Sequence, residues 1–169
     1  MSIKHRFDAE KAIEVLLYIA KRVPDMYNAL KVLYFADKEH LAKYGRLICG
    51  DSYVAMSHGP VPSGAYDLVK YARGDGFCPV DLPVNEAFAV QGYTIIPHRE
   101  ANLDLLSESD LECLDAAIGR YGHLPFSRLR KLSHDAAFKS ADQNDFIPLE
   151  AIAKSLPDGE LLLDYIQNG

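Results

Sequence analysis

The sequence contains no tryptophan, and its three cysteines form no Cys-x-x-Cys pair. Zinc ribbons and dithiol redox motifs need cysteines at that spacing, so neither kind of site is indicated. Widely separated cysteines that stay reduced are typical of cytosolic proteins.

Long apolar runs are missing as well. The longest one, residues 15–20, has six residues, whereas a membrane-spanning helix needs about 18 or more. Asp8 and Glu10 interrupt the stretch where a signal peptide would need an apolar segment. We therefore expect a soluble, cytoplasmic protein with no membrane partner.

Positive charge is in deficit, because the net charge is −6 and the pI is near 5.5. Nucleic-acid binding depends largely on clustered Lys and Arg. The densest basic group, Arg128, Arg130 and Lys131, is short, and we interpret it as the solvated face of a small helix. Charge therefore argues against nucleic acid as a partner.

Known catalytic signatures are also absent. The sequence has no Gly-rich phosphate loop with lysine, no Gly-x-Ser-x-Gly elbow and no His-Glu-x-x-His motif. We expect a protein that is not an enzyme and needs no cofactor or metal.

What the chain does have is a globular composition, with 49% hydrophobic and 25% charged residues over 169 positions. That length can bury a sizeable core, and no repeat or linker divides it. We expect residues 1–169 to form one domain.

The segment 25–44 predicts a central helix. At about 100° per residue it has a broad apolar arc that also includes Asp37 and His40, three residues apart and close enough to touch. A carboxylate that faces a core must be paired or protonated. We interpret the pair as buried scaffold, while a metal or acid/base site and a role in gripping a partner stay open.

The rest of the chain predicts a mainly α, α+β fold: a central helical hairpin, about six to seven helices and a small antiparallel sheet of about two to three strands at one edge. Asp8, Asp25, Ser63 and Ser107 are expected to cap helices. Strands over 52–56, 86–91 and 93–98 would form the sheet, and the two prolines in 58–62 exclude a helix there. Leu161, Leu162, Tyr165 and Ile166 are expected to pack the last helix onto the core.

The residues 33–41 (LYFADKEHL), 44–46 (YGR), 50–56 (GDSYVAM), 58–63 (HGPVPS) and 66–68 (YDL) resemble the signature of the Panacea-domain, or SocA-like, antitoxin family, which includes GepA-type phage-associated proteins. The match is close over the first ~75 residues. This resemblance implies a bacterial or phage protein that neutralises a cognate toxin, encoded nearby, by direct protein contact.

Tyrosines and His58 gather around the Pro-rich segment, and tyrosine is enriched at recognition surfaces because its ring is apolar and its tip polar. A homodimer is left open. Two other functions stay as alternatives: a metal-dependent hydrolase or nuclease using Asp37, His40 and His58, and a winged-helix-like transcriptional regulator. The residues expected to form the partner-binding cluster, some of them as scaffold, are Tyr34, Asp37, His40, Arg46, Tyr53, His58, Pro60 and Tyr66.

Overall fold

A computed structural model describes residues 6–168, in which nine helices, one 3-10 turn and five strands occur. The helices are α1 (Ala9–Ala20), α2 (Met26–Tyr44), α3 (Ser63–Ala72), α4 (Val84–Ala87), α5 (Glu108–Tyr121), α6 (Phe126–Ser133), α7 (Ala136–Lys139), α8 (Leu149–Lys154) and α9 (Gly159–Asn168), and the 3-10 turn is η1 (Leu103–Leu105). The strands are β1 (Tyr53–Met56), β2 (Gly59–Pro62), β3 (Phe88–Gln91), β4 (Thr94–Pro97) and β5 (Phe146–Ile147). The predicted mainly α, α+β class is confirmed, and the two short helices α4 and α7 are additional to the six to seven that the sequence predicts. Helix α4 includes residues 86–87, which are expected to begin a strand.

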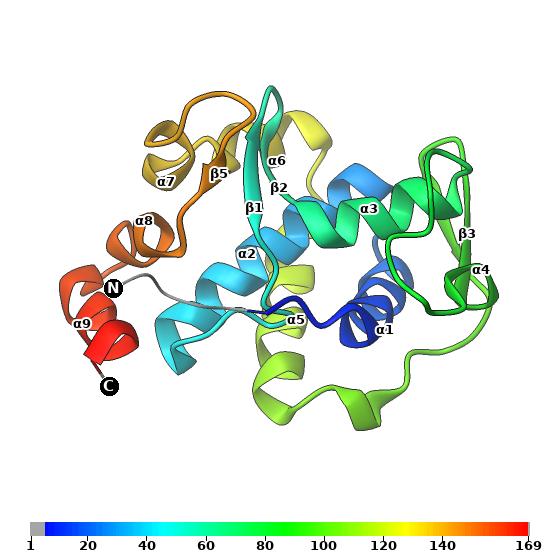
Figure 1. The fold of residues 1–169 in the computed structure, drawn as a ribbon, viewed down its shortest axis with the longest axis horizontal. Helices are drawn as coiled ribbons and strands as arrows, with labels where there is room; N and C mark the ends of the chain where they lie inside the picture. Colours follow the sequence, from blue (N-terminus) through cyan, green and yellow to red (C-terminus); the bar gives the residue numbers. More distant parts are fainter. Residues whose placement is uncertain (1–5, 169) are drawn as a thin grey trace.

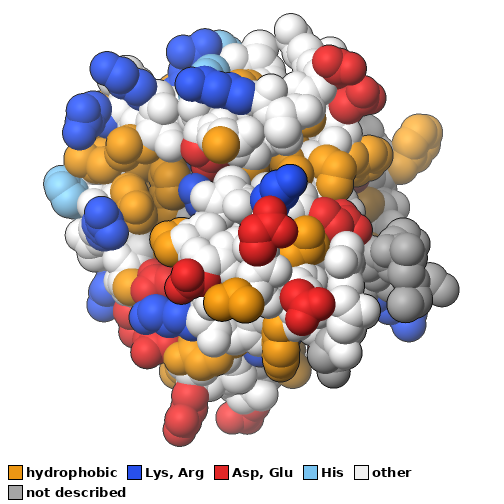
Figure 2. Space-filling view, turned by 90° about the vertical axis from the view of Figure 1, so that its left-hand side faces the viewer, with side chains coloured by type: hydrophobic (Ala, Val, Ile, Leu, Met, Phe, Trp, Pro, Cys, Tyr) orange, Lys and Arg blue, Asp and Glu red, His pale blue; other side chains and the backbone are white. Residues whose placement is uncertain are grey.

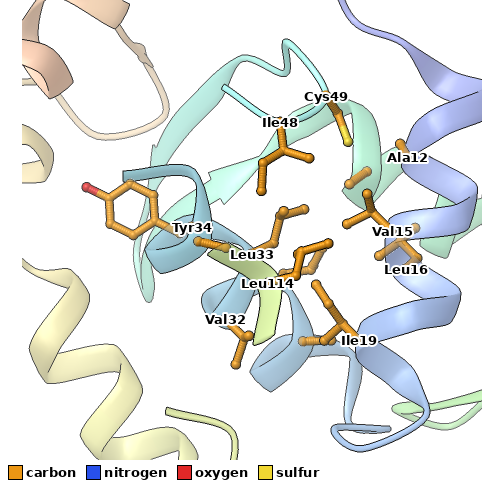
Figure 3. Packing of buried hydrophobic residues seen from close by; sticks show 14 of the residues in the cluster. Ala12, Val15, Leu16, Ile19, Val32, Leu33, Tyr34, Ile48, Cys49 and Leu114 are labelled. Atoms are coloured by element: carbon orange, nitrogen blue, oxygen red, sulfur yellow. The ribbon is translucent and has the colours of Figure 1, made fainter. Parts of the chain in front are cut away.

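Helix α2 is central, and it contacts α1, α3, α5, α6, α8 and β2 (Figure 1). Both of its faces are covered: Val32 is fully buried, although it lies opposite the arc that contains Leu33. In Figure 3, Leu16 and Ile19 of α1 point toward Leu33 and Leu114, while Tyr34 points away from this group. Helix α2 therefore separates an α1/α5 core from a second packing region around Tyr34.

Local capping signals set several helix boundaries. The side chains of Asp8 and Asp25 accept hydrogen bonds from Lys11 N and Asn28 N, and Ser107 forms a capping box with Asp110. These predictions are confirmed.

The prediction for α3 is wrong, because Ser63 is its first helical residue and makes no cap. Asp51, which precedes β1, caps α3 instead. Its carboxylate accepts hydrogen bonds from Gly64 N at 2.8 Å and from Ala65 N at 2.9 Å. A cap supplied from twelve residues upstream leaves no local pattern.

The strands form two antiparallel sheets, with orders β2-β1-β5 and β3-β4, so the predicted single sheet joining 52–56 to the later hairpin is wrong. Strand β1 pairs with β2, Tyr53 opposite Pro62, and with β5, Tyr53 opposite Ile147. The Pro-rich segment forms the edge strand β2. Pro60 and Pro62 are tolerated there because a residue in an edge strand does not need to hydrogen-bond to a neighbouring strand on both sides.

Two further outcomes concern the surface. Leu161 and Tyr165 of α9 are 73% and 63% exposed, so the expected packing of these two side chains is wrong. Leu162 and Ile166 are partly buried against the core, as expected. Over residues 6–168, no helix is long and apolar enough to cross a membrane. On the face that carries α7 to α9, Lys and Arg side chains gather toward the upper left and many of the acidic ones lie lower down (Figure 2).

Candidate functional site

Asp37 is buried, at 1% exposure, and joins α2 to the loop and strand that follow it. Its Oδ1 accepts a hydrogen bond from Ile48 N at 2.7 Å, and its Oδ2 accepts one from the Tyr53 hydroxyl at 2.6 Å. Burial raises the pKa of Asp37 to about 7, although the bonds from Tyr53 and Ile48 act in the opposite direction. The buried, paired state of Asp37 expected from the sequence is confirmed.

His40 is also buried but has its own partners. Its Nδ1 lies 2.8 Å from Arg46 O, and its Nε2 lies 2.9 Å from Ser109 Oγ and 3.4 Å from Asp110 Oδ1. Burial lowers the pKa of His40. Lys11 binds Asp110 at 2.7 Å, so this group connects α1, α2 and the start of α5.

Tyr34 points to the opposite side of α2, where its hydroxyl donates to Asp135 Oδ2 at 2.8 Å. Lys38 donates to the same oxygen at 2.8 Å, and Asp135 caps α7. The Tyr34 and Tyr53 rings meet edge to face with centroids 5.0 Å apart. Helix α2, β1 and α7 are therefore linked through two tyrosines in edge-to-face contact and two carboxylates.

Lys31 is a buried cation that helical periodicity does not predict, because it lies on the side of the helix that also carries Glu39 and Lys43. It is 3% exposed, and its Nζ donates to Pro60 O at 2.9 Å. Burial, followed by the charge of Arg130, lowers the pKa of Lys31 to about 7. The available signal was its aromatic surroundings at i−4, i+3 and i+4.

Gly59 allows the β1–β2 hairpin to approach Lys31 this closely. Its φ is +115°, and a Cβ there would lie 2.6 Å from Ser133 Oγ and 2.8 Å from Lys31 Nζ. A Cβ would need an unfavourable backbone conformation, and either these two side chains or the hairpin would have to move. Gly59 therefore allows the β1–β2 turn to lie directly against the lysine.

Beside this turn is a cavity of about 110 Å³, which we call the hairpin pocket. It is lined by Tyr27, Leu30, Lys31, Met56, Ser57, His58, Val61, Tyr66 and Phe126. The Tyr27 and Phe126 ring centroids are 6.0 Å apart, and His58 meets Phe126 edge-on at 6.0 Å. Helices α2, α3 and α6 and the hairpin thus enclose a recess with aromatic walls.

Polar groups mark the rim of the hairpin pocket. Arg130 Nε donates to His58 Nδ1 at 3.2 Å, and Arg130 Nη2 donates to Ser57 O at 3.3 Å. Lys70 Nζ lies 4.6 Å from the centre of the Tyr66 ring. Burial and the neighbouring Tyr27 hydroxyl raise the pKa of Tyr66, which stays a neutral hydrogen-bonding group at physiological pH.

The eight residues expected at the partner-binding cluster are not on one surface. Tyr34, Asp37, His40 and Tyr53 are inside the protein, and Pro60 is buried in β2 over Lys31. Arg46 lies by α5, where its Nη2 is 3.3 Å from Asp110 Oδ1. Only His58 and Tyr66 line the hairpin pocket.

The metal site considered as an alternative, with Asp37, His40 and His58 as ligands, is not assembled either. Asp37 and His40 direct their polar atoms at separate partners, and His58 is on the hairpin turn, bound to Arg130. Among residues 6–168, no group of three or more His, Cys, Asp or Glu side chains is placed to hold a metal ion.

Comparison with known proteins bears on the same part of the chain. No curated protein and no solved structure matches it significantly. A family model described as "Antitoxin SocA-like, Panacea domain" matches residues 30–138, which include all but the first four residues of α2, the β1–β2 hairpin and every lining residue of the hairpin pocket except Tyr27. Because the match covers well over half of the sequence, the chain belongs to the SocA-like antitoxin family with a Panacea domain.

Proposed function

We propose that this chain is the cytoplasmic antitoxin of a bacterial or phage toxin–antitoxin pair, and that it neutralises a cognate toxin by binding it directly, with no catalysis of its own. The family supports the antitoxin class. The hairpin pocket, a recess with aromatic walls and polar tips on the rim, is the observation that carries direct binding.

Such a recess has the properties of an interface centre. Binding energy is concentrated in a few well-packed positions rich in Tyr, Trp and Arg, often where a side chain fills a pocket. The hairpin pocket offers Tyr27 and Tyr66, with Arg130 at its edge. A stable complex buries roughly 1,200–2,000 Å² in total, so surrounding surface must also take part.

The buried members of the predicted cluster have a supporting role in this proposal. Tyr53 and Asp37 hold β1 against α2, and Pro60 holds β2 against Lys31. His40 and Arg46 hold the loop between α2 and β1 against α5. These residues position the hairpin, whereas His58 and Tyr66 make contact with the toxin.

The test is co-expression with the product of the neighbouring gene. We expect that product to arrest growth alone, and the chain to restore growth and copurify with it. Tyr66→Ala and His58→Ala should each weaken the complex by tenfold or more, because they remove pocket walls. Tyr165→Ala is the control, since Tyr165 is exposed on α9, outside the matched segment.

Rescue of growth without a detectable complex would contradict direct binding, and undiminished affinity in both pocket variants would place the interface elsewhere. The free chain could also form a homodimer, which would use self-complementary contacts. Sedimentation measures the mass of the free chain and the mass of its complex with the toxin. A dimeric free chain and a one-to-one complex would show that the toxin replaces a second copy.

A further inference from the structure

The size of the hairpin pocket limits what can enter it. A cavity of about 110 Å³ is well above the roughly 10–15 Å³ that one water molecule needs, so it has room for a side chain. Tyr27, Tyr66 and Phe126 supply flat apolar walls. An entering group must therefore have a slender apolar stem.

Among the described residues, the lysine that lines the hairpin pocket has no acidic partner. Lys31 lines the pocket and no Asp or Glu does, although Lys70 on the rim is paired with Asp67. Arg130 adjoins His58 at 3.2 Å, and over the described part of the chain no carboxylate lies within ion-pair distance of Lys31 or Arg130. Lys38, about two turns further along α2, is by contrast paired with Asp135.

The hydrogen-bonding capacity of this pocket also exceeds its use. An ammonium group has three donors, and within residues 6–168 Pro60 O is the one acceptor found for Lys31 Nζ. Because His58 Nδ1 accepts from Arg130, the neutral imidazole carries its proton on Nε2, a second donor. A buried ammonium without a counter-ion is costly, and a carboxylate would offset that cost.

We infer that the hairpin pocket binds a glutamate side chain of the toxin, whose methylene stem packs against the aromatic walls and whose carboxylate is bound by Lys31 and His58. This inference rests on the proposed function and adds the chemistry of the partner's anchoring residue. A lysine or arginine anchor would meet like charge, and a purely apolar anchor would leave the ammonium unpaired.

Two small probes test the pocket without the toxin: N-acetylglutamate N-methylamide and its glutamine analogue, which has the same shape and no charge. Each is titrated into the full-length chain and followed by chemical-shift changes at Lys31 and Tyr66. We expect the glutamate probe to bind at least tenfold more tightly than the glutamine probe. Equal binding, or no binding of either probe at tens of millimolar, would overturn the inference.

Lys31→Met keeps the side-chain length and removes the charge, and we expect it to abolish the preference for glutamate. Arg130→Gln, at an exposed site, should reduce it several-fold, and Lys21→Met, at a remote 65% exposed lysine, should leave it unchanged. Circular dichroism checks that Lys31→Met folds. If Lys31→Met does not fold, Arg130→Gln decides: an unchanged preference in that variant overturns the inference.

The pH dependence gives a second readout. The groups facing Lys31 are Tyr27 on its own helix, His58 on the hairpin, Tyr66 on α3, Arg130 on α6, and His134 directly after α6. Since the pKa of Lys31 is about 7 in the free chain, its charged fraction falls above that pH. Binding of the glutamate probe should be more than fivefold weaker at pH 8.5 than at pH 6.5, and pH-independent binding would contradict this assignment.

The experiment with the toxin distinguishes a failure of the glutamate anchor from a failure of the proposed antitoxin function. If wild type and Lys31→Met neutralise the neighbouring gene's product equally well, the glutamate anchor is wrong while the antitoxin function stands. If wild type fails to bind that product yet discriminates between the probes, the proposed function fails and the carboxylate pocket stands.

Discussion

Asp37 shows how one side chain connects distant parts of the sequence. Its two oxygens bind Ile48 and Tyr53, eleven and sixteen positions further along the chain. Removing it leaves the Ile48 amide and the Tyr53 hydroxyl buried with no acceptor, and each such loss costs more than the hydrogen bond contributed.

We predict that Asp37→Ala lowers the free energy of unfolding by about 1–3 kcal/mol, because buried donors are left unpaired. Urea denaturation measures the change. Tyr53→Phe, alone and combined with Asp37→Ala, forms a double-mutant cycle. Strictly additive effects would show that the Tyr53–Asp37 hydrogen bond does not couple the two residues. Unchanged stability with lost toxin binding would move Asp37 from scaffold to interface.

The pKa of Asp37 predicts a pH dependence with a definite sign. Folding raises the pKa of Asp37 from 3.8 to about 7. At pH values between these two, the folded chain binds the proton and the unfolded chain does not. Stability from this group is therefore present below about pH 4 and lost as pH rises to about 7. Relative to Asp37→Asn, wild type should lose a few kcal/mol between pH 4 and pH 7, measured by urea denaturation at each pH. A parallel pair of pH profiles would contradict the shift.

Lys31 predicts the opposite slope in a different window. Its pKa falls from 10.5 to about 7 on folding, so between those values the unfolded chain binds the proton and the folded chain does not. Stability should rise from about pH 7 to pH 10. Lys31→Met should remove that rise, and denaturation midpoints of both proteins across this range provide the comparison.

At the scale of elements, the β1–β2 hairpin depends on its close approach to α2 and α6. Gly59 has φ +115° and no room for a Cβ, whereas Gly74 has φ +98° and open space within 4 Å of a Cβ. The two glycines thus separate backbone strain from steric conflict.

We predict that Gly74→Ala costs about 1–2 kcal/mol, from backbone conformation alone. Gly59→Ala should cost clearly more and also weaken toxin binding, since the hairpin must move off Lys31 and Ser133. Thermal denaturation and the copurification assay measure the two effects. Equal costs for the two variants would show that the hairpin shifts freely.

At the scale of the whole molecule, net charge and local charge differ in sign. The chain has a net charge of −6, yet the hairpin pocket and the exposed Arg128, Arg130 and Lys131 of α6 are positive. Such separation orients an incoming partner, because long-range steering depends on the distribution of charge as well as its sum.

We predict that association with the toxin is steered by charge. The association rate should fall several-fold between 50 and 500 mM NaCl, about 0.05 and 0.5 M, because exposed charges more than a few ångström apart are screened at the higher concentration. The dissociation rate should change much less. Surface plasmon resonance separates the two rates, and a salt-independent association rate would contradict steering.

The sequence by itself determined the helices longer than four residues, the family and the burial of Asp37. Asp8, Asp25 and the Ser107–Asp110 capping box act through bonds to backbone groups within three residues, so their effect is legible locally. The mainly α class follows from these signals and from helical periodicity.

Only the tertiary structure decided which distant segments meet. The pairing of β5 with β1 spans about ninety residues and involves a two-residue strand, too short to show periodicity. The burial of Lys31 depends on the hairpin resting over it, and the hairpin pocket exists because four elements close around one point. Local preferences specify where helices begin and end, but long-range packing determines which side chains are buried, paired or exposed.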